Sequence, residues 1–294
     1  GAAPMADPLP VCHLNGEFLA LRDARISPLD RGFLFADGVY EVMPVFAGRP
    51  SRFGPHFDRL ARSLAEIRMR DPHDREGWRT LVAELIERNG GGDQYVYLQV
   101  TRGAEYGRNH APLPDLPPTV FAYCAPLPRP PAEHLRHGIA CVTAEDTRWS
   151  RCDIKSVALL ANVLLRQLAC DVGAQETILL RDGLLTDASA STVHVVRGGV
   201  LRTPPDSRWI LPGTTRSVVE ELATRIGLPW EAAPVSEAEL RAADEIWLAA
   251  ATREVSSVTR LDGKPVGAGE PGPQFRRLRA AFDEMKRELA SQPW

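Results

Sequence analysis

The sequence has few lysines and few cysteines, no long hydrophobic run and no excess of charge of one sign. Its 294 residues include 35 lysines and arginines against 38 acidic residues, for a formal net charge of -3. The arginines are interleaved with acidic residues rather than grouped, so the chain lacks the basic block typical of nucleic-acid binding. We therefore expect no nucleic-acid partner.

The absences also argue against a membrane protein and a metal protein. No apolar run approaches the roughly 18 to 20 residues of a membrane span, and no secretion signal is recognisable. The cysteines are widely spaced and include no Cys-x-x-Cys pair, so neither a disulfide framework nor a metal site is expected. We expect a cytoplasmic globular protein without a membrane partner. Met5 is expected to be the native start, and residues 1–4 are set aside.

The scarcity of lysine makes each one informative. Lys264 follows a turn, and Lys286 lies in an amphipathic C-terminal pattern, so both are expected at the solvated surface. Lys155 precedes an apolar stretch, where a chain rich in arginine gains no charge by using lysine. Lysine differs from arginine because it can lose its proton and act as a nucleophile. Lys155 is therefore a candidate catalytic residue.

The first half of the chain is predicted to begin as a sheet, because Asn15-Gly16 and Ala47-Gly48 are hairpin signals. Strands are predicted over 11–21, 39–46, 94–101 and 119–124, and helices over 58–69 and 78–88. The polar loop 102–118 is long for a compact domain, and loops of that length are often functional.

The second half mixes strands and helices. Strands are predicted over 138–144, 176–180, 193–196, 200–202, 244–250 and 254–261, and helices over 156–172, 213–226 and 274–289. The proline-rich stretch 125–131 is the expected linker. The sequence thus predicts an α+β protein with a small N-terminal domain (5–124) and a larger C-terminal domain (132–294) that carries Lys155.

Two segments have the composition of a phosphate site. Leu211 to Arg216 places a glycine and two threonines at a predicted helix start, where free N–H groups and the helix dipole favour an anion. The turn at 250–253 follows an apolar strand and offers further N–H donors. An ordinary helix start and an ordinary strand-ending turn are the alternatives at these two places.

Cationic side chains suggest two further contacts. Arg59 lies three residues after His56 on a predicted helix and can grip a phosphate, unless it is one more surface arginine. Arg108 and His110 form a compact pair in the long loop that suits a carboxylate, with a solvated loop as the alternative. The stretch 186–191 is either part of a site or a polar turn.

In order and spacing, these pieces resemble the class IV (fold type IV) aminotransferases, and most closely the D-amino acid transaminases. The matching stretches are 30–41, 56–60, 99–103, 146–156, 181–183 with 186–191, and 211–216. The resemblance implies a small N-terminal α/β domain and a larger C-terminal domain with a mixed sheet or barrel, paired as a homodimer. It also implies pyridoxal 5'-phosphate bound as a Schiff base to Lys155 between the two domains.

The resemblance assigns roles residue by residue. Lys155 is the catalytic base, and Tyr40, Arg108 and His110 bind the substrate, the last two from the partner subunit. The residues implied to bind the cofactor are Arg59, Lys155, Asp187, Leu211, Thr214, Thr215 and Thr252. Asp187 departs from the family, which normally has glutamate there to keep the pyridine nitrogen protonated. Thr192 and His194 also differ from the usual asparagine and phenylalanine.

The implied reaction is ping-pong transamination between a D-amino acid of the D-alanine type and a 2-oxo acid of the 2-oxoglutarate type. Branched-chain and (R)-amine aminotransferases and aminodeoxychorismate lyase share the fold and remain alternatives. A further alternative is a protein that binds pyridoxal phosphate without catalysis, because Asp187, Thr192 and His194 depart from the family pattern.

Overall fold

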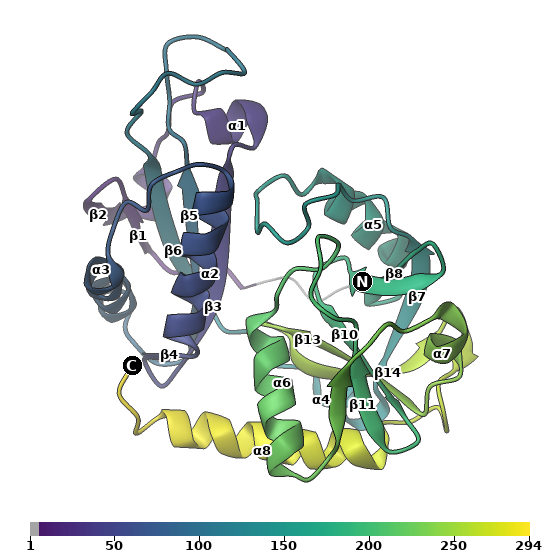
Figure 1. Cartoon of the computed structure of the whole chain (residues 1–294). Coiled ribbons are helices and arrows are strands. Elements are labelled where there is room, and N and C mark those ends of the chain that lie inside the picture. Colours follow the sequence, from purple (N-terminus) through teal and green to yellow (C-terminus); the bar gives the residue numbers. More distant parts are fainter. Residues whose placement is uncertain (1–5) are drawn as a thin grey trace. The chain divides into compact units, whose positions relative to one another are not determined.

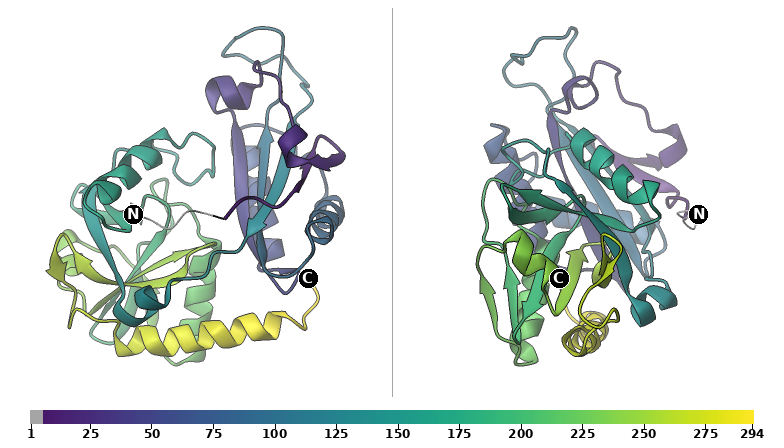
Figure 2. Two further views of the ribbon diagram at one scale, coloured as in Figure 1. Left: turned by 180° about the vertical axis from the view of Figure 1, so that it is seen from behind. Right: turned by 90° about the vertical axis from the view of Figure 1, so that its right-hand side faces the viewer.

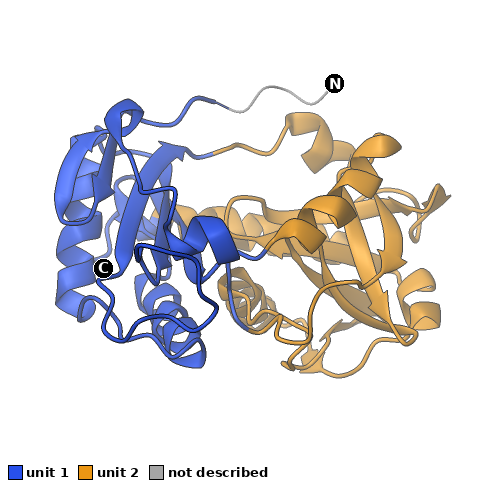
Figure 3. Ribbon diagram, turned by 90° about the horizontal axis from the view of Figure 1, so that it is seen from above, with its two compact units in different colours: residues 1–127, 154–158, 288–294 blue, residues 128–153, 159–287 orange. Residues whose placement is uncertain are grey.

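The computed structural model describes residues 6–294, so the expected start at Met5 lies outside the described residues. Contacts within the chain divide it into two compact units (Figure 1, Figure 3). Unit 1 comprises the chain up to residue 127 together with 154–158 and 288–294, and unit 2 comprises 128–153 and 159–287. Each unit contains its own sheet and its own hydrophobic core.

Unit 1 is built on an antiparallel sheet of six strands in the order β2-β1-β6-β5-β3-β4. The strands are β1 (Val11–Leu14), β2 (Glu17–Ala20), β3 (Gly38–Phe46), β4 (Arg49–Pro50), β5 (Gln94–Thr101) and β6 (Thr119–Pro126). Both predicted hairpins are present, and their turns use positive φ at Asn15, Gly16, Ala47 and Gly48.

Helices cover one face of this sheet. These are α2 (Phe53–Glu66) and α3 (Arg75–Arg88). Unit 1 also contains α1 (Arg31–Phe35) and the short η1 (Leu21–Asp23). Alternate residues of β5, such as Val96 and Leu98, are buried in one cluster with apolar side chains of α2 and α3. The residues between them point to the opposite face, which carries Tyr97. α2 begins earlier than predicted because Phe53 is buried against Phe57, with their ring centroids 4.6 Å apart.

Unit 2 is built on a mixed sheet of nine strands, with β15 paired to β14 beside the main order β12-β11-β10-β13-β14-β7-β8-β9. The strands are β7 (Ile139–Glu145), β8 (Glu176–Arg181), β9 (Leu184–Ala188), β10 (Thr192–Arg197), β11 (Val200–Thr203), β12 (Trp230–Ala232), β13 (Glu245–Ala250), β14 (Glu254–Leu261) and β15 (Lys264–Pro265). Its helices are α4 (Ala132–His137), α5 (Leu160–Asp171), α6 (Thr214–Arg225), α7 (Glu237–Arg241) and α8 (Pro273–Leu289).

The sheet of unit 2 is buried on both faces. In β13, Ile246 and Leu248 join a cluster on one face, whereas Trp247 and Ala249 join another on the opposite face. α6 and α8 supply the helical side of the second cluster (Figure 1, Figure 2). This double burial explains why β13 reads as a continuous apolar run rather than an alternation.

The segment 154–158 runs alongside β3. Tyr40 donates its N–H to the carbonyl oxygen of Lys155 at 3.1 Å, and Ser156 forms a bridge with Val39. The predicted helix over 156–172 therefore begins only at Leu160, because the residues before it use their backbone groups in this pairing. Through this pairing, Lys155 belongs to unit 1. The sequence predicted it to lie in the domain 132–294. The predicted boundaries 5–124, 125–131 and 132–294 remain a prediction.

Adjacent leucines of β9 allow a matched test of the core of unit 2. Leu185 is 3% exposed and Leu184 is 45% exposed, because they point to opposite faces of the strand. We expect Leu185→Ala to lower the free energy of unfolding by about 2 to 5 kcal/mol, and Leu184→Ala to lower it by less than about 1 kcal/mol. Urea denaturation measures both, and equal losses would contradict this description of the core.

Candidate active site

Both backbone polar groups of Lys155 form hydrogen bonds within unit 1. Its carbonyl oxygen accepts the N–H of Tyr40, and its own N–H donates to Ser63 Oγ at 3.3 Å. Its Nζ lies 4.3 Å from the centroid of the Tyr40 ring, within the range of a cation–π contact. Lys155 and Tyr40, which the sequence singled out separately, are therefore neighbours in space.

Next to Tyr40 in β3, Glu41 points to the other face and organises Arg59. Arg59 donates from Nε to Glu41 Oε2 at 2.8 Å and from Nη2 to Oε1 at 2.7 Å. His56 Nδ1 lies 2.7 Å from the same Oε1. Burial favours a raised pKa for Glu41, but Arg59 and His56 outweigh it and lower that pKa to about 2. The carboxylate therefore stays ionised and fixes the plane of the Arg59 guanidinium.

Arg108 and His110 lie on the loop between β5 and β6 and are exposed. Both contact Phe35 of α1: the Arg108 guanidinium carbon lies 4.6 Å from the ring centroid, and the His110 ring centroid lies 5.3 Å from it. The structure thus brings this predicted pair together. Within residues 6–294, neither of these side chains contacts Lys155.

In unit 2, Asp187 of β9 is buried beside Arg148. Arg148 Nη1 lies 3.3 Å from Asp187 Oδ2, and the Leu211 N–H donates to the same oxygen at 3.4 Å. Neither bond uses Oδ1. Burial raises the pKa of Asp187 to about 6, although Arg148 and the Leu211 N–H oppose this shift. Arg148 is oriented in turn by Asp146, which accepts from its Nε and Nη2 at 3.0 and 2.9 Å.

Thr214 and Thr215 begin α6, as the sequence predicted. The N-cap is Gly213, which makes no side-chain cap hydrogen bond to the first N–H groups. A Cβ at Gly213 would come within 2.8 Å of Thr192 Oγ1 and 3.1 Å of Arg216 Cβ, so a larger residue would require Thr192 or Arg216 to shift. Free N–H groups at the start of a helix of this length favour an anion.

Thr252 lies at the same end of the sheet as this helix start. It is half-buried in the turn between β13 and β14, directly after the end of β13, where Thr192 pairs with Ala249. Thr192 thus lies next to the start of α6 and on the strand paired with β13. His194, the other departure, is buried and bonds Thr203 Oγ1 through Nδ1 at 2.7 Å. Burial, with Arg216 nearby, lowers the pKa of His194 to about 3, so the ring is neutral.

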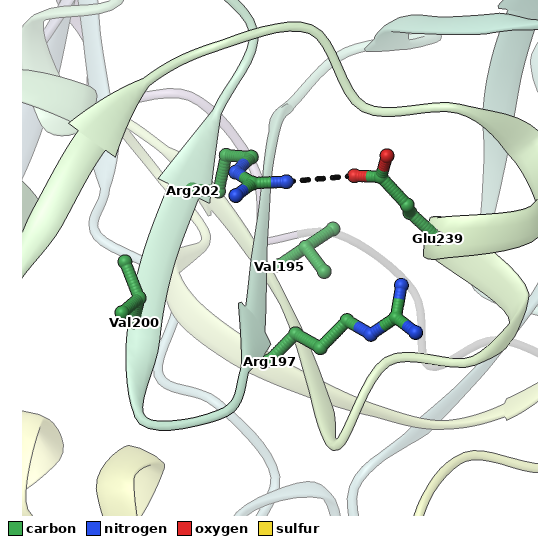
Figure 4. Close-up of a pocket in the computed structure, with 5 residues that line it drawn as sticks. All are labelled: Val195, Arg197, Val200, Arg202 and Glu239. Carbon is green, nitrogen blue, oxygen red and sulfur yellow. Dashed lines mark hydrogen bonds and ion pairs between the residues drawn. The ribbon is translucent and has the colours of Figure 1, made fainter.

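A separate pocket in unit 2 has a volume of about 270 Å³ (Figure 4). It is lined by Val195, Arg197, Val200, Arg202 and Glu239, with Arg202 bonded to Glu239 at 2.8 Å. None of the predicted site residues lines it, so it is not the predicted site.

The sequence did not single out two charged residues that contact predicted ones, Glu41 and Arg148. It named Thr192 as a departure from the family but did not predict that Thr192 lies beside the start of α6. Glu41 interrupts an apolar strand, which is a usable signal because a buried carboxylate needs a partner. Among residues 6–294, no group of three or more metal-binding side chains gathers. In the same part of the chain, no helix is long and apolar enough to cross a membrane.

Comparison with known proteins adds the family. The model of the family "Amino-transferase class IV" matches residues 38–261. The chain belongs to the class IV aminotransferases.

Two curated relatives of the chain are D-alanine aminotransferases. That of Staphylococcus aureus (strain MSSA476) is 37% identical over 272 residues, which cover 92% of this chain and 96% of the relative. That of Bacillus licheniformis is 39% identical over 268 residues, covering 91% and 94%. Both alignments extend over the two units of this class IV aminotransferase.

Solved structures confirm the fold. The branched-chain amino acid aminotransferase of Escherichia coli superimposes with a TM-score of 0.90 at 24% identity, covering 97% of each chain. The branched-chain enzyme of T.th., solved with pyridoxamine 5'-phosphate, gives a TM-score of 0.88 at 25% identity, covering 96% and 95%. The predictions of family, of the two-domain fold type IV architecture and of aminotransferase activity are confirmed.

Pyridoxal 5'-phosphate is the cofactor of class IV aminotransferases, and the residues of this member suit it. The start of α6 offers N–H donors beside Gly213, where a side chain would approach Thr192 closely, and such donors suit a phosphate. Asp187 is a buried acceptor whose hydrogen bonds from Arg148 and Leu211 both go to Oδ2, and such a carboxylate suits the N–H of a protonated pyridine ring. Each of these features lies within unit 2.

The raised pKa of Asp187 predicts a pH-dependent stability. The folded state binds the proton more tightly than the unfolded state, so this contribution to stability is full below about pH 4 and is lost as the pH rises through about 6. Relative to Asp187→Asn, the cofactor-free wild type should lose about 2 kcal/mol of unfolding free energy between about pH 4 and pH 7.

Urea denaturation at several pH values measures this difference. Asp115→Asn, in an exposed loop, is the matched control for loss of one carboxylate. A difference between wild type and Asp187→Asn that does not change with pH would contradict the raised pKa.

Proposed function

We propose that this class IV aminotransferase transfers the amino group of a D-amino acid of the D-alanine type to a 2-oxo acid of the 2-oxoglutarate type, by a ping-pong route. The observation that carries the choice of substrate is the pair Arg108 and His110 held on one ring, Phe35. An arginine beside an imidazole suits a carboxylate, and the curated relatives are D-alanine aminotransferases.

Lys155 is proposed as the catalytic residue. Its Nζ would hold the cofactor and then carry the proton between the substrate Cα and the cofactor C4' carbon. When bound, the cofactor supplies a protonated pyridine ring that takes up the electron pair left at Cα. The support for Lys155 is its fixed backbone and the position of its Nζ over the ring of Tyr40. Tyr40 would border the substrate side of the cofactor ring.

The remaining predicted residues are proposed to position the cofactor. Arg59, with the N–H and hydroxyl groups of Thr214, Thr215 and Thr252, would hold the phosphate. Leu211 would pack on the ring face, and Asp187 would accept the pyridine N–H. Support comes from the Glu41 carboxylate that orients Arg59, and from the uncapped start of α6. A rigid set of donors loses little entropy when the cofactor binds.

We further propose that the enzyme is a homodimer. α5 carries an apolar stripe with spacings of three and four residues, and its members are strongly exposed. They are Leu160 (72%), Val163 (60%), Leu164 (61%) and Leu168 (46%). A stripe of this kind marks a surface for association. Arg108 and His110 would then act in the site of the partner subunit.

The proposed compartment is the cytoplasm. Four of the five cysteines are buried and all five are free, which agrees with a reducing environment. Neither nucleic acid nor a membrane is a proposed partner, since the charge is balanced along the chain.

The substrate proposal predicts a selective effect of Arg108. Loss of a charged hydrogen bond to the substrate carboxylate should raise the KM for D-alanine about 10- to 100-fold in Arg108→Ala. The KM for an amine donor without a carboxylate should change little. Steady-state kinetics with D-alanine, an L-branched-chain amino acid and such an amine measure the effect, with exposed Arg129→Ala as the control. Equal changes for acid and amine donors would refute the carboxylate role.

The homodimer and the role of Arg108 in the partner's site can be tested by complementation. Lys155→Ala and Arg108→Ala protomers, each with low activity alone, are mixed under conditions that exchange subunits. About half of the dimers are then mixed, and one of their two sites has both residues, so about a quarter of wild-type activity should return. No recovery in a verified mixed dimer would place Arg108 in its own subunit's site.

A further inference from the structure

The motif Asp30-Arg31-Gly32 lies in the part of the chain that resembles the family, yet the proposed function gives it no role. Arg31 begins α1 and is only 4% exposed. Figure 1 shows α1 next to the loop that joins β5 and β6. A buried arginine on such a short helix requires an explanation, because burying an unpaired charge is costly.

The Arg31 guanidinium contacts the loop at several points. Nη1 donates to Glu105 Oε1 at 2.7 Å and to the carbonyl oxygen of Asn109, and Nη2 donates to the carbonyl oxygen of His110 at 2.9 Å. The Arg31 N–H also donates to the Gly103 carbonyl at 2.8 Å. The residues on both sides of Arg108 are therefore held by one side chain.

Acidic residues complete this cluster and balance its charge. Arg31 Nε donates to Asp37 Oδ2 at 2.9 Å, and Arg102, at the start of the loop, donates to both oxygens of Asp37 at 2.7 and 3.0 Å. Glu105 also accepts the Leu113 N–H at 3.1 Å. Two arginines thus face two carboxylates, so the buried charges are paired and each part of the loop has a partner.

Asp30 secures the two ends of the loop. Its Oδ1 accepts from Thr101 Oγ1 at 2.8 Å, and its Oδ2 accepts from Thr119 Oγ1 at 2.6 Å. These threonines face each other across β5 and β6, where the loop leaves the sheet. Gly32 lies so close to Thr101 that a Cβ there would approach its Cγ2 to 2.3 Å. The motif as a whole fits against the base of the loop.

We propose that Arg31 is a positioning residue for substrate recognition, because it fixes the backbone of Asn109 and His110 so that Arg108 and His110 stand together over Phe35. The inference rests on the proposed function, in which this pair binds the substrate carboxylate. A side chain that is placed before the substrate arrives loses less entropy on binding, and a small displacement of such a group weakens recognition strongly.

The test uses Arg31→Lys in the holoenzyme. Lysine keeps the positive charge beside Asp37 and Glu105, but its single nitrogen cannot reproduce the fork that reaches both carbonyl groups. We expect the KM for D-alanine to rise about tenfold, with kcat changed less than about twofold. The KM for an amine without a carboxylate should stay as in the wild type. Arg22→Lys, at an exposed position outside the cluster, is the matched control.

Hydrogen exchange of the same holoenzyme gives a readout that does not depend on activity. Backbone amides of residues 105–113 should exchange faster in Arg31→Lys, whereas those of β5 and β6 should keep their wild-type rates. Faster exchange throughout unit 1 would indicate general damage and would overturn a specific role.

The double variant Arg31→Lys/Arg108→Ala separates this proposal from the proposed function. If Arg31 acts through Arg108 and His110, the lysine substitution should add little to the KM of Arg108→Ala. Full additivity would overturn the proposal, as would an Arg31→Lys enzyme with wild-type KM and loop exchange. If Arg108→Ala leaves the KM for D-alanine unchanged, the carboxylate role itself fails, and this inference fails with it.

Discussion

The hydrogen bond from the Tyr40 N–H to the Lys155 carbonyl is the contact on which the placement of Lys155, the proposed catalytic residue, depends. It holds Lys155 against β3 although the chain has by then passed through α4 and β7, so a residue from the middle of the sequence is fixed in unit 1. The same strand then presents Tyr40 on one face and Glu41 on the other. The strand β3 therefore contributes Tyr40 to the surroundings of Lys155. Through Glu41 it also orients Arg59, which is predicted to bind the phosphate.

A second constraint is that buried charges occur in matched sets. Glu41 faces Arg59, Arg148 lies between Asp146 and Asp187, and two arginines share two carboxylates below the long loop. Such sets add little net stability, because desolvation offsets much of their attraction. What they provide is orientation, since a bidentate arginine has one plane and few rotamers compatible with it. In each set, a member or a direct neighbour is a predicted site residue.

The sequence predicted elements well wherever one face of an element is buried and the other is not. β5 alternates and was found with its full bounds, and the threonines at the start of α6 followed from a glycine before an apolar period. The sequence-based prediction was wrong or incomplete where a long-range contact determines the start of an element or the burial of a side chain. Nothing local shows that Ser156 pairs with Val39, so the helix was started too early. Arg31 and Arg148 look like the other arginines of the chain, and only the fold reveals that they are buried.

Asp187 departs from the family motif and also lies in an unusual electrostatic environment. Aspartate is one methylene shorter than the glutamate of the family, yet it keeps a buried carboxylate next to Arg148. Burial raises the pKa of Asp187 to about 6, and Arg148, which is also held by Asp146 and by the Trp209 carbonyl, lowers it too little to reverse that shift. A carboxylate in that state gains from a new cationic N–H donor, since the donor would favour its ionised form. In the proposed role of Asp187, the shorter side chain would keep the electrostatic reason for binding a protonated ring, and its length would change only the distance over which that attraction acts.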